Sequence, residues 1–177
     1  MKKQFYIHFS FLIAYFLIIT LIRRWFSLKD IGFWLGGLIG TLLPYSDHFI
    51  YVYFLRPIEP MSLEVRSLVG GKNLRRAFEL LITTRRERQK MIFHTVYFQI
   101  IFLVLTFFVI TSSGSIFGRG LVLAFALHLL IDQIIDWMET KNLDNWFLNL
   151  PISLDKEQKQ LYLLGNIFLL LLFGLYF

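Results

Sequence analysis

The stretch LVLAFALHLLIDQIIDWM, residues Leu121–Met138, decides the fold class of this protein. Its 18 residues include no Lys or Arg. As a helix they would rise about 27 Å, which nearly crosses a hydrocarbon core of about 30 Å. The stretch nevertheless contains His128 and Asp132, and ionisable groups inside a membrane helix indicate a function by default.

Four more stretches are similarly long and apolar and contain no Lys or Arg, namely Phe5–Ile22, Ile31–Leu55, Ile92–Thr111 and Leu161–Phe177. In lipid the backbone must satisfy its own hydrogen bonds, so each stretch predicts a helix. We therefore expect an all-α, polytopic membrane protein, one integral domain over residues 1–177 with about five transmembrane helices. Pro44 interrupts the second stretch, where we expect a kink or a break.

The composition excludes other classes of protein. The hydrophobic fraction is 56% and the charged fraction 17%, against about 45–50% and about 25% in soluble domains. The mean hydropathy is +0.61 and 20 residues are Phe, more apolar side chain than a soluble globule can bury or a disordered chain would carry. The absence of Cys excludes a disulfide scaffold, a thiolate zinc site and an iron–sulfur cluster.

The net charge of +6 is unevenly distributed along the chain. If the five helices alternate in direction, one side of the membrane carries 14 Lys and Arg and the other carries 4. The positive-inside rule then predicts a multi-pass protein of the cytoplasmic (inner) membrane. Its N-terminus and the loop 56–91 would face the cytoplasm, and its C-terminus would lie outside.

The basic loop 56–91 has Leu74, Phe78 and Leu81 at helical spacing among many Lys and Arg. This pattern predicts an amphipathic helix that lies on anionic lipid headgroups. A solvated basic loop that only enforces topology is an equal alternative. We expect the lipid bilayer as the partner, and no nucleic acid, because the chain has no recognition module.

A glycine recurs at every fourth position of the second stretch, at Gly32, Gly36 and Gly40. A helix face without side chains allows another helix to approach closely. We expect this face to pack within the monomer, with a homodimer as the alternative.

Seven ionisable residues that could take part in chemistry lie inside the apolar stretches. They are all four histidines of the chain, His8, His48, His94 and His128, and the aspartates Asp47, Asp132 and Asp136. With the predicted topology, all of them fall in the cytoplasmic half of the bilayer. Four helices would therefore present imidazoles and carboxylates at a similar depth.

His128 and Asp132 are four residues apart and share one helix face, where they could bind one cation. Imidazole and carboxylate are ordinary zinc ligands. A structural polar cluster and a proton or ion pathway remain alternatives. Asp136, one turn further, would orient a ligand imidazole or be an interfacial carboxylate beside Trp137.

The order of these motifs is similar to that of a known family. His8 is followed by Leu42-Leu43-Pro44-Tyr45-Ser46-Asp47-His48, then Phe93-His94-Thr95, then His128 through Asp132. Over about residues 5–138 this set resembles the membrane-bound metal-dependent hydrolases, the YdjM-like inner-membrane proteins. The resemblance implies a fold and an activity like those of zinc-dependent phospholipase C and the P1-type nucleases.

The resemblance also implies the ligands of one divalent metal, expected to be zinc: His8, Asp47, His94, His128 and Asp132. His48 would be a catalytic general base or would support a ligand. Tyr45 and Gln89 stand where the family has an Asp and a His, which argues against a multinuclear centre.

We therefore expect a membrane-embedded metal-dependent hydrolase that acts at the cytoplasmic leaflet on a phosphate ester or phospholipid. The alternatives are a non-catalytic membrane protein with a structural metal or polar cluster, and a proton- or ion-coupled transporter element. The outer parts of two helices, Leu103–Ile110 and Leu121–Leu127, are almost wholly apolar, which argues against a polar path across the membrane.

Overall fold

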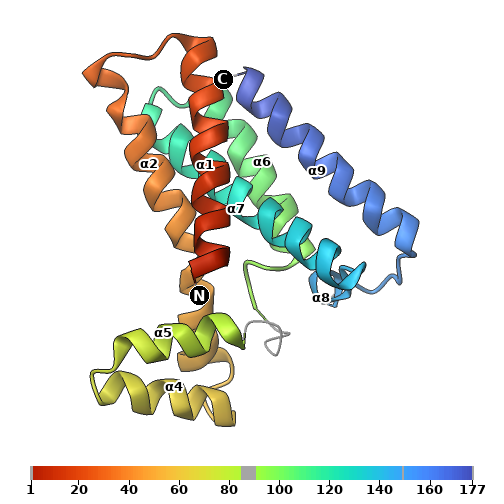
Figure 1. Cartoon of the computed structure of the whole chain (residues 1–177). Coiled ribbons are helices and arrows are strands. Elements are labelled where there is room, and N and C mark those ends of the chain that lie inside the picture. Colours follow the sequence, from red (N-terminus) through yellow and green to blue (C-terminus); the bar gives the residue numbers. More distant parts are fainter. Residues whose placement is uncertain (1, 85–90, 149, 177) are drawn as a thin grey trace.

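The computed structural model describes residues 2–84, 91–148 and 150–176 of the chain. These residues form helices joined by loops, with no β-strand among them, so the all-α prediction is confirmed (Figure 1). The helices are α1 Lys2–Arg23, η1 Leu28–Asp30, α2 Ile31–Leu42, η2 Leu43–Tyr45, α3 Ser46–Ile50, η3 Tyr51–Leu55, α4 Pro60–Gly70, α5 Leu74–Thr83, α6 Val96–Ser112, α7 Ile116–Thr140, α8 Asp144–Phe147 and α9 Lys156–Tyr176.

Three helices, α1, α7 and α9, are long and apolar enough to cross a membrane. α6 is also apolar but has only 17 residues. The most apolar 18-residue window of α7 is 67% buried, whereas those of α1 and α9 are each 28% buried. α7 is therefore the central helix, and α1 and α9 leave rows of large apolar side chains on the surface for lipid to cover.

The second apolar stretch is not one continuous helix. α2 ends at Leu42, and the chain continues through a tight 3₁₀ turn that contains Pro44, the short α3 and the π-helical turn η3. Proline has no N–H to donate and its ring clashes with the preceding helical turn, so the predicted break is confirmed at this position. The break leaves Asp47 and His48 buried on α3.

The glycine face of α2 packs against α7, as predicted for packing within the monomer. A Cβ added at Gly36 would lie 2.1 Å from the carbonyl oxygen of Phe117, and one added at Gly40 would lie 2.2 Å from that of Leu121. Gly120 of α7 is equally close to the backbone of α2. The two helices therefore meet backbone to backbone, which only glycine permits.

The loop 56–91 contains a helical hairpin, α4 and α5, and the residues 85–90 of this loop lie outside the described part. α5 confirms the predicted helix, and of its predicted apolar side Leu81 is buried in protein whereas Leu74 is 63% exposed. Ala77 and Leu81 are buried with Val65 of α4 and Val52 of η3 in a small separate core. α4 and η3 therefore cover the part of α5 that carries Ala77 and Leu81.

Candidate metal centre

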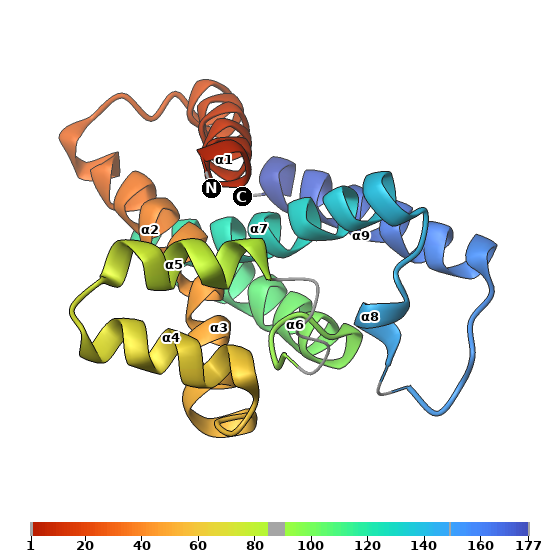
Figure 2. The same cartoon turned by 60° about the horizontal axis from the view of Figure 1, so that its bottom comes forward.

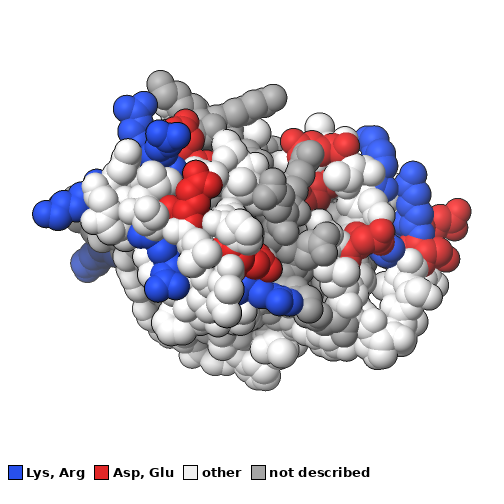
Figure 3. Space-filling view, turned by 90° about the horizontal axis from the view of Figure 1, so that it is seen from below, with Lys and Arg blue, Asp and Glu red and all other residues white. Residues whose placement is uncertain are grey.

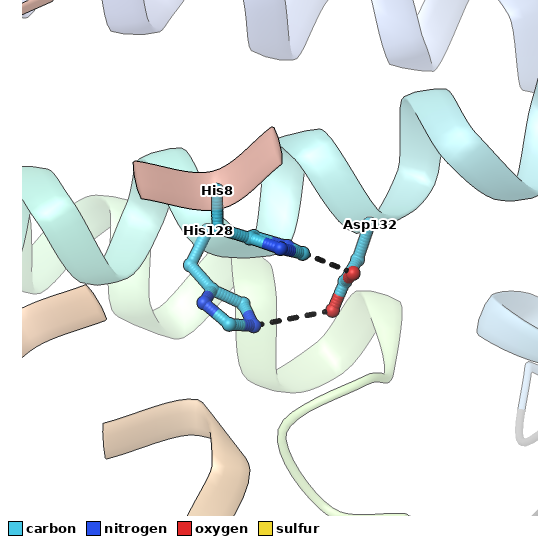
Figure 4. A group of neighbouring side chains, drawn as sticks. All are labelled: His8, His128 and Asp132. Atoms are coloured by element: carbon cyan, nitrogen blue, oxygen red, sulfur yellow. Dashed lines mark hydrogen bonds and ion pairs between the residues drawn. The ribbon is translucent and has the colours of Figure 1, made fainter. Parts of the chain in front are cut away.

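Asp132 is the centre of a buried cluster of histidines. Its carboxylate on α7 is reached by the Nε2 atoms of His8 at 3.0 Å, His94 at 3.0 Å and His128 at 3.3 Å. All four side chains are at least nine-tenths buried. Figure 4 shows His8 and His128 both directed at the carboxylate. The expected convergence of these residues is therefore found.

Three segments of the fold position the cluster. His128 and Asp132 lie one turn apart on α7 and so point to the same side. His8 comes from the first turns of α1, and its ring stacks on that of His128 with 4.0 Å between centroids. His94 lies just before α6, where the Thr95 side chain accepts a hydrogen bond from the Phe98 N–H and caps the helix.

Asp47 lies on the opposite side of the His94 ring from Asp132. Its carboxylate accepts hydrogen bonds from the backbone N–H groups of Ile92 (2.9 Å) and Phe93 (2.7 Å). The same carboxylate lies 2.9 Å from Nδ1 of His94. The sequence predicted Asp47 as a metal ligand, but the structure places it behind His94, where it orients the imidazole.

Three ring contacts extend the cluster. His48, the predicted general base, stacks on His94 with 6.0 Å between ring centroids. Tyr45 stands edge-on to His128 at 4.9 Å, and Phe78 of α5 packs on the ring of Tyr45 at 6.0 Å. The α4–α5 hairpin is therefore in contact with the ring that packs edge-on against His128.

Asp136 is not among the residues directed at the cluster. Its carboxylate accepts a hydrogen bond of 2.8 Å from the indole N–H of Trp146. Trp146 is buried and packs on His94, with 5.5 Å between ring centroids. Asp136 thus joins α7 to α8 and is connected to His94 through the indole of Trp146.

The donor atoms are suitably arranged for a divalent metal. One ligand atom from each of His8, His128 and Asp132 can be chosen so that all lie within 4.8 Å of one another. Tetrahedral zinc with bonds of about 2.0–2.2 Å requires ligand atoms about 3.3–3.6 Å apart. The observed separations of 3.0–3.3 Å from Asp132 need only a small expansion.

One polar atom of the cluster has no hydrogen bond. Nδ1 of His128 is buried and has no hydrogen-bond partner among the described residues. Such atoms are rare in protein interiors, and a bound ion or an ordered water commonly accounts for them. A cation held between Nε2 of His128 and Asp132 would leave Nδ1 unpaired, so the fit of this site to a cation rests on the spacing of the other donor atoms.

The cluster also concentrates negative charge. Asp47 and Asp132 are both almost fully buried, and within the described ranges every ion-pair partner of the two carboxylates is a histidine. Two buried carboxylates need two positive charges nearby. Protonated histidines or one divalent cation could each supply positive charge to this site, and two backbone N–H groups already stabilise the carboxylate of Asp47.

A second polar network was missed by the sequence reasoning. The side chains of Gln99 on α6 and Gln133 on α7 form a reciprocal amide pair, and both amides are buried. Tyr162 donates to Gln99 at 2.6 Å and Asn166 donates to Gln133 at 3.4 Å, which ties in α9. The available signal was uncharged amides inside the apolar stretches, whereas only ionisable residues were considered.

No family model, curated protein or solved structure matches the chain. Of the two positions that depart from the hydrolase motifs, Tyr45 lies against His128, and Gln89 lies outside the described residues. Function must therefore be inferred from the chemistry of the histidine–aspartate cluster.

Proposed function

We propose that this protein is a membrane-embedded hydrolase that depends on one divalent metal, with zinc as the expected ion. The supporting observation is that three imidazoles from separate segments direct Nε2 at the single buried carboxylate of Asp132. Asp132, His8 and His128 would hold the metal, and His94 would complete the set. Imidazole nitrogen and carboxylate oxygen are the donors that zinc takes in catalytic sites.

A bound metal would avoid the repulsion between protonated histidines in the cluster. One divalent cation would balance Asp47 and Asp132 together and would bind imidazole in its neutral form. The alternative requires two imidazolium groups side by side in a low-dielectric interior, where like charges repel.

When bound, the metal would polarise a phosphoryl or acyl oxygen and lower the pKa of its water to about 7. Asp47 would fix the orientation of His94 through Nδ1, as carboxylates commonly do for ligand histidines. His48, stacked beside His94, would accept the proton of the attacking water.

The proposed substrate is a phosphate ester or a phospholipid. The ordered motifs resemble those of the YdjM-like membrane-bound hydrolases, and His8 and His94 lie near the ends of α1 and α6 that would approach one membrane surface. Tyr45 replaces one family ligand and packs on His128, which supports a single metal ion.

A structural polar cluster is the second candidate. Each separation from Asp132 is also an ordinary hydrogen-bond length, so the same geometry could join α1, α7 and the start of α6 without a metal. In that case the cluster would contribute only to stability.

Metal analysis of the detergent-purified protein distinguishes the two. We expect about one metal per chain, retained through purification, and loss of at least about tenfold in occupancy in His128→Ala. Gln133→Ala is the matched control, because it removes a buried polar side chain of the same helix outside the cluster. It should keep the metal although it is less stable.

Hydrolysis of a phospholipid in mixed micelles tests the activity. We expect turnover in the wild type that a chelator abolishes and zinc restores, and none in Asp132→Asn. Wild-type protein without metal, together with a lowered melting temperature in His128→Ala, would establish the structural role instead.

A further inference from the structure

The tip of the α4–α5 hairpin carries cations that the fold does not use. Lys72, Arg75 and Arg76 are exposed at the turn and in the first turn of α5. In the described part of the chain none of the three forms an ion pair. Leu74, between them, is 63% exposed. An exposed apolar side chain flanked by unpaired cations is typical of a membrane-contacting surface.

Helix stability does not account for this arrangement. The N-terminal end of a helix carries a partial positive charge, so Arg75 and Arg76 in the first turn of α5 oppose the helix dipole. Cations placed there weaken the helix slightly unless an anion lies nearby. The local electrostatics therefore favour a negatively charged partner.

The hairpin lies where lipid headgroups would be. α1 has 22 residues and so a length of about 33 Å, which already covers a hydrocarbon core of about 30 Å. The hairpin lies across the bundle just beyond the N-terminal end of α1 (Figures 1 and 2). Seen from that end, Lys and Arg project from the side of the molecule that carries the hairpin tip (Figure 3).

We propose that the hairpin tip docks on the anionic headgroups of the adjacent leaflet. Lys72, Arg75 and Arg76 would contact lipid phosphates, and Leu74 would enter the interfacial layer. This surface shares only Leu74 with the amphipathic face predicted from the sequence, whose Leu81 is buried in the small core with Val65 of α4. The inference requires no metal and stands apart from the proposed hydrolase activity.

The lack of cysteine in the chain provides a direct test. Gly70 lies at the tip, and a Cβ added there meets nothing within 4 Å, so Gly70→Cys can carry an environment-sensitive fluorophore. The labelled protein is placed in nanodiscs of phosphatidylcholine alone or mixed with phosphatidylglycerol. Emission wavelength and quenching by acrylamide, which is neutral, report whether the tip contacts lipid.

We expect a shorter emission wavelength and weaker quenching in the anionic nanodiscs, and reversal by high salt. Arg75→Gln/Arg76→Gln should lower the ratio of docked to undocked protein by about fivefold for each cation removed. Arg24→Asn/Lys29→Gln, which removes two cations from a different loop, is the matched control and should behave as the wild type.

Equal emission and quenching in the two lipid compositions would overturn the proposal. So would an unchanged response in Arg75→Gln/Arg76→Gln. A chelator should leave the docking signal as it was, so failure of the docking proposal and failure of the hydrolase proposal give separate results.

Discussion

Replacing Gly36 by Ala adds one methyl group at the closest contact between α2 and α7. The new Cβ would lie 2.1 Å from the carbonyl oxygen of Phe117. Carbon–oxygen contacts between packed helices are about 3.3–3.6 Å, so the backbones would have to separate by about 1.2–1.5 Å. No flexible side chain can move instead, because the atom in contact is backbone.

The expected cost is therefore at the upper end of the range for overpacking, about 3 kcal/mol. Alanine regains about 1 kcal/mol through its higher helix propensity, which leaves a net loss of about 2 kcal/mol. For a chain of this size the melting temperature should fall by about 4–8 °C. The matched control is Gly32→Ala on the same helix, where the nearest atoms lie 3.8 Å from the added Cβ.

Gly32→Ala gains helix propensity without a clash, so its melting temperature should rise by about 2–4 °C. The two substitutions are chemically identical and differ in predicted sign. Thermal unfolding in detergent, followed by tryptophan fluorescence, measures both. If Gly36→Ala proves as stable as Gly32→Ala, the backbone contact between α2 and α7 is refuted.

Asp47→Asn should lower metal affinity by about 10–100-fold, because the amide cannot accept hydrogen bonds from both backbone N–H groups and still hold His94. Equilibrium dialysis measures the affinity, and a value equal to that of the wild type would contradict the role of Asp47. The hydrogen bond from Lys159 holds the pKa of Asp144 below its usual value. A depressed carboxyl pKa gives stability that is present above the unfolded pKa of about 3.9 and is lost as the pH falls through the folded value. Asp144→Asn should therefore show a smaller drop in melting temperature on acidification than the wild type, and identical pH profiles would argue against the pair.

The sequence by itself determined the properties that depend on neighbours along one helix. The lengths of the apolar stretches fix where helices can form in lipid, and Pro44 fixes the break, because both effects act within a few residues. The four-residue spacing of His128 and Asp132 likewise places them on one face of α7. The glycine repeat of α2 indicated a close helix contact because its four-residue spacing places the glycines on one face.

Only the tertiary structure shows which polar side chains of different helices contact one another. Asp132 lies at the centre of the cluster, whereas Asp47 lies on the Nδ1 side of His94. The carboxylate of Asp47 accepts hydrogen bonds from the backbone N–H groups of Ile92 and Phe93, which hold it there. Depth along separate helices cannot predict this, since rotation about each helix axis and the path of each loop set which side chains meet. Those rotations depend on packing between residues far apart in sequence, and such packing leaves no local pattern.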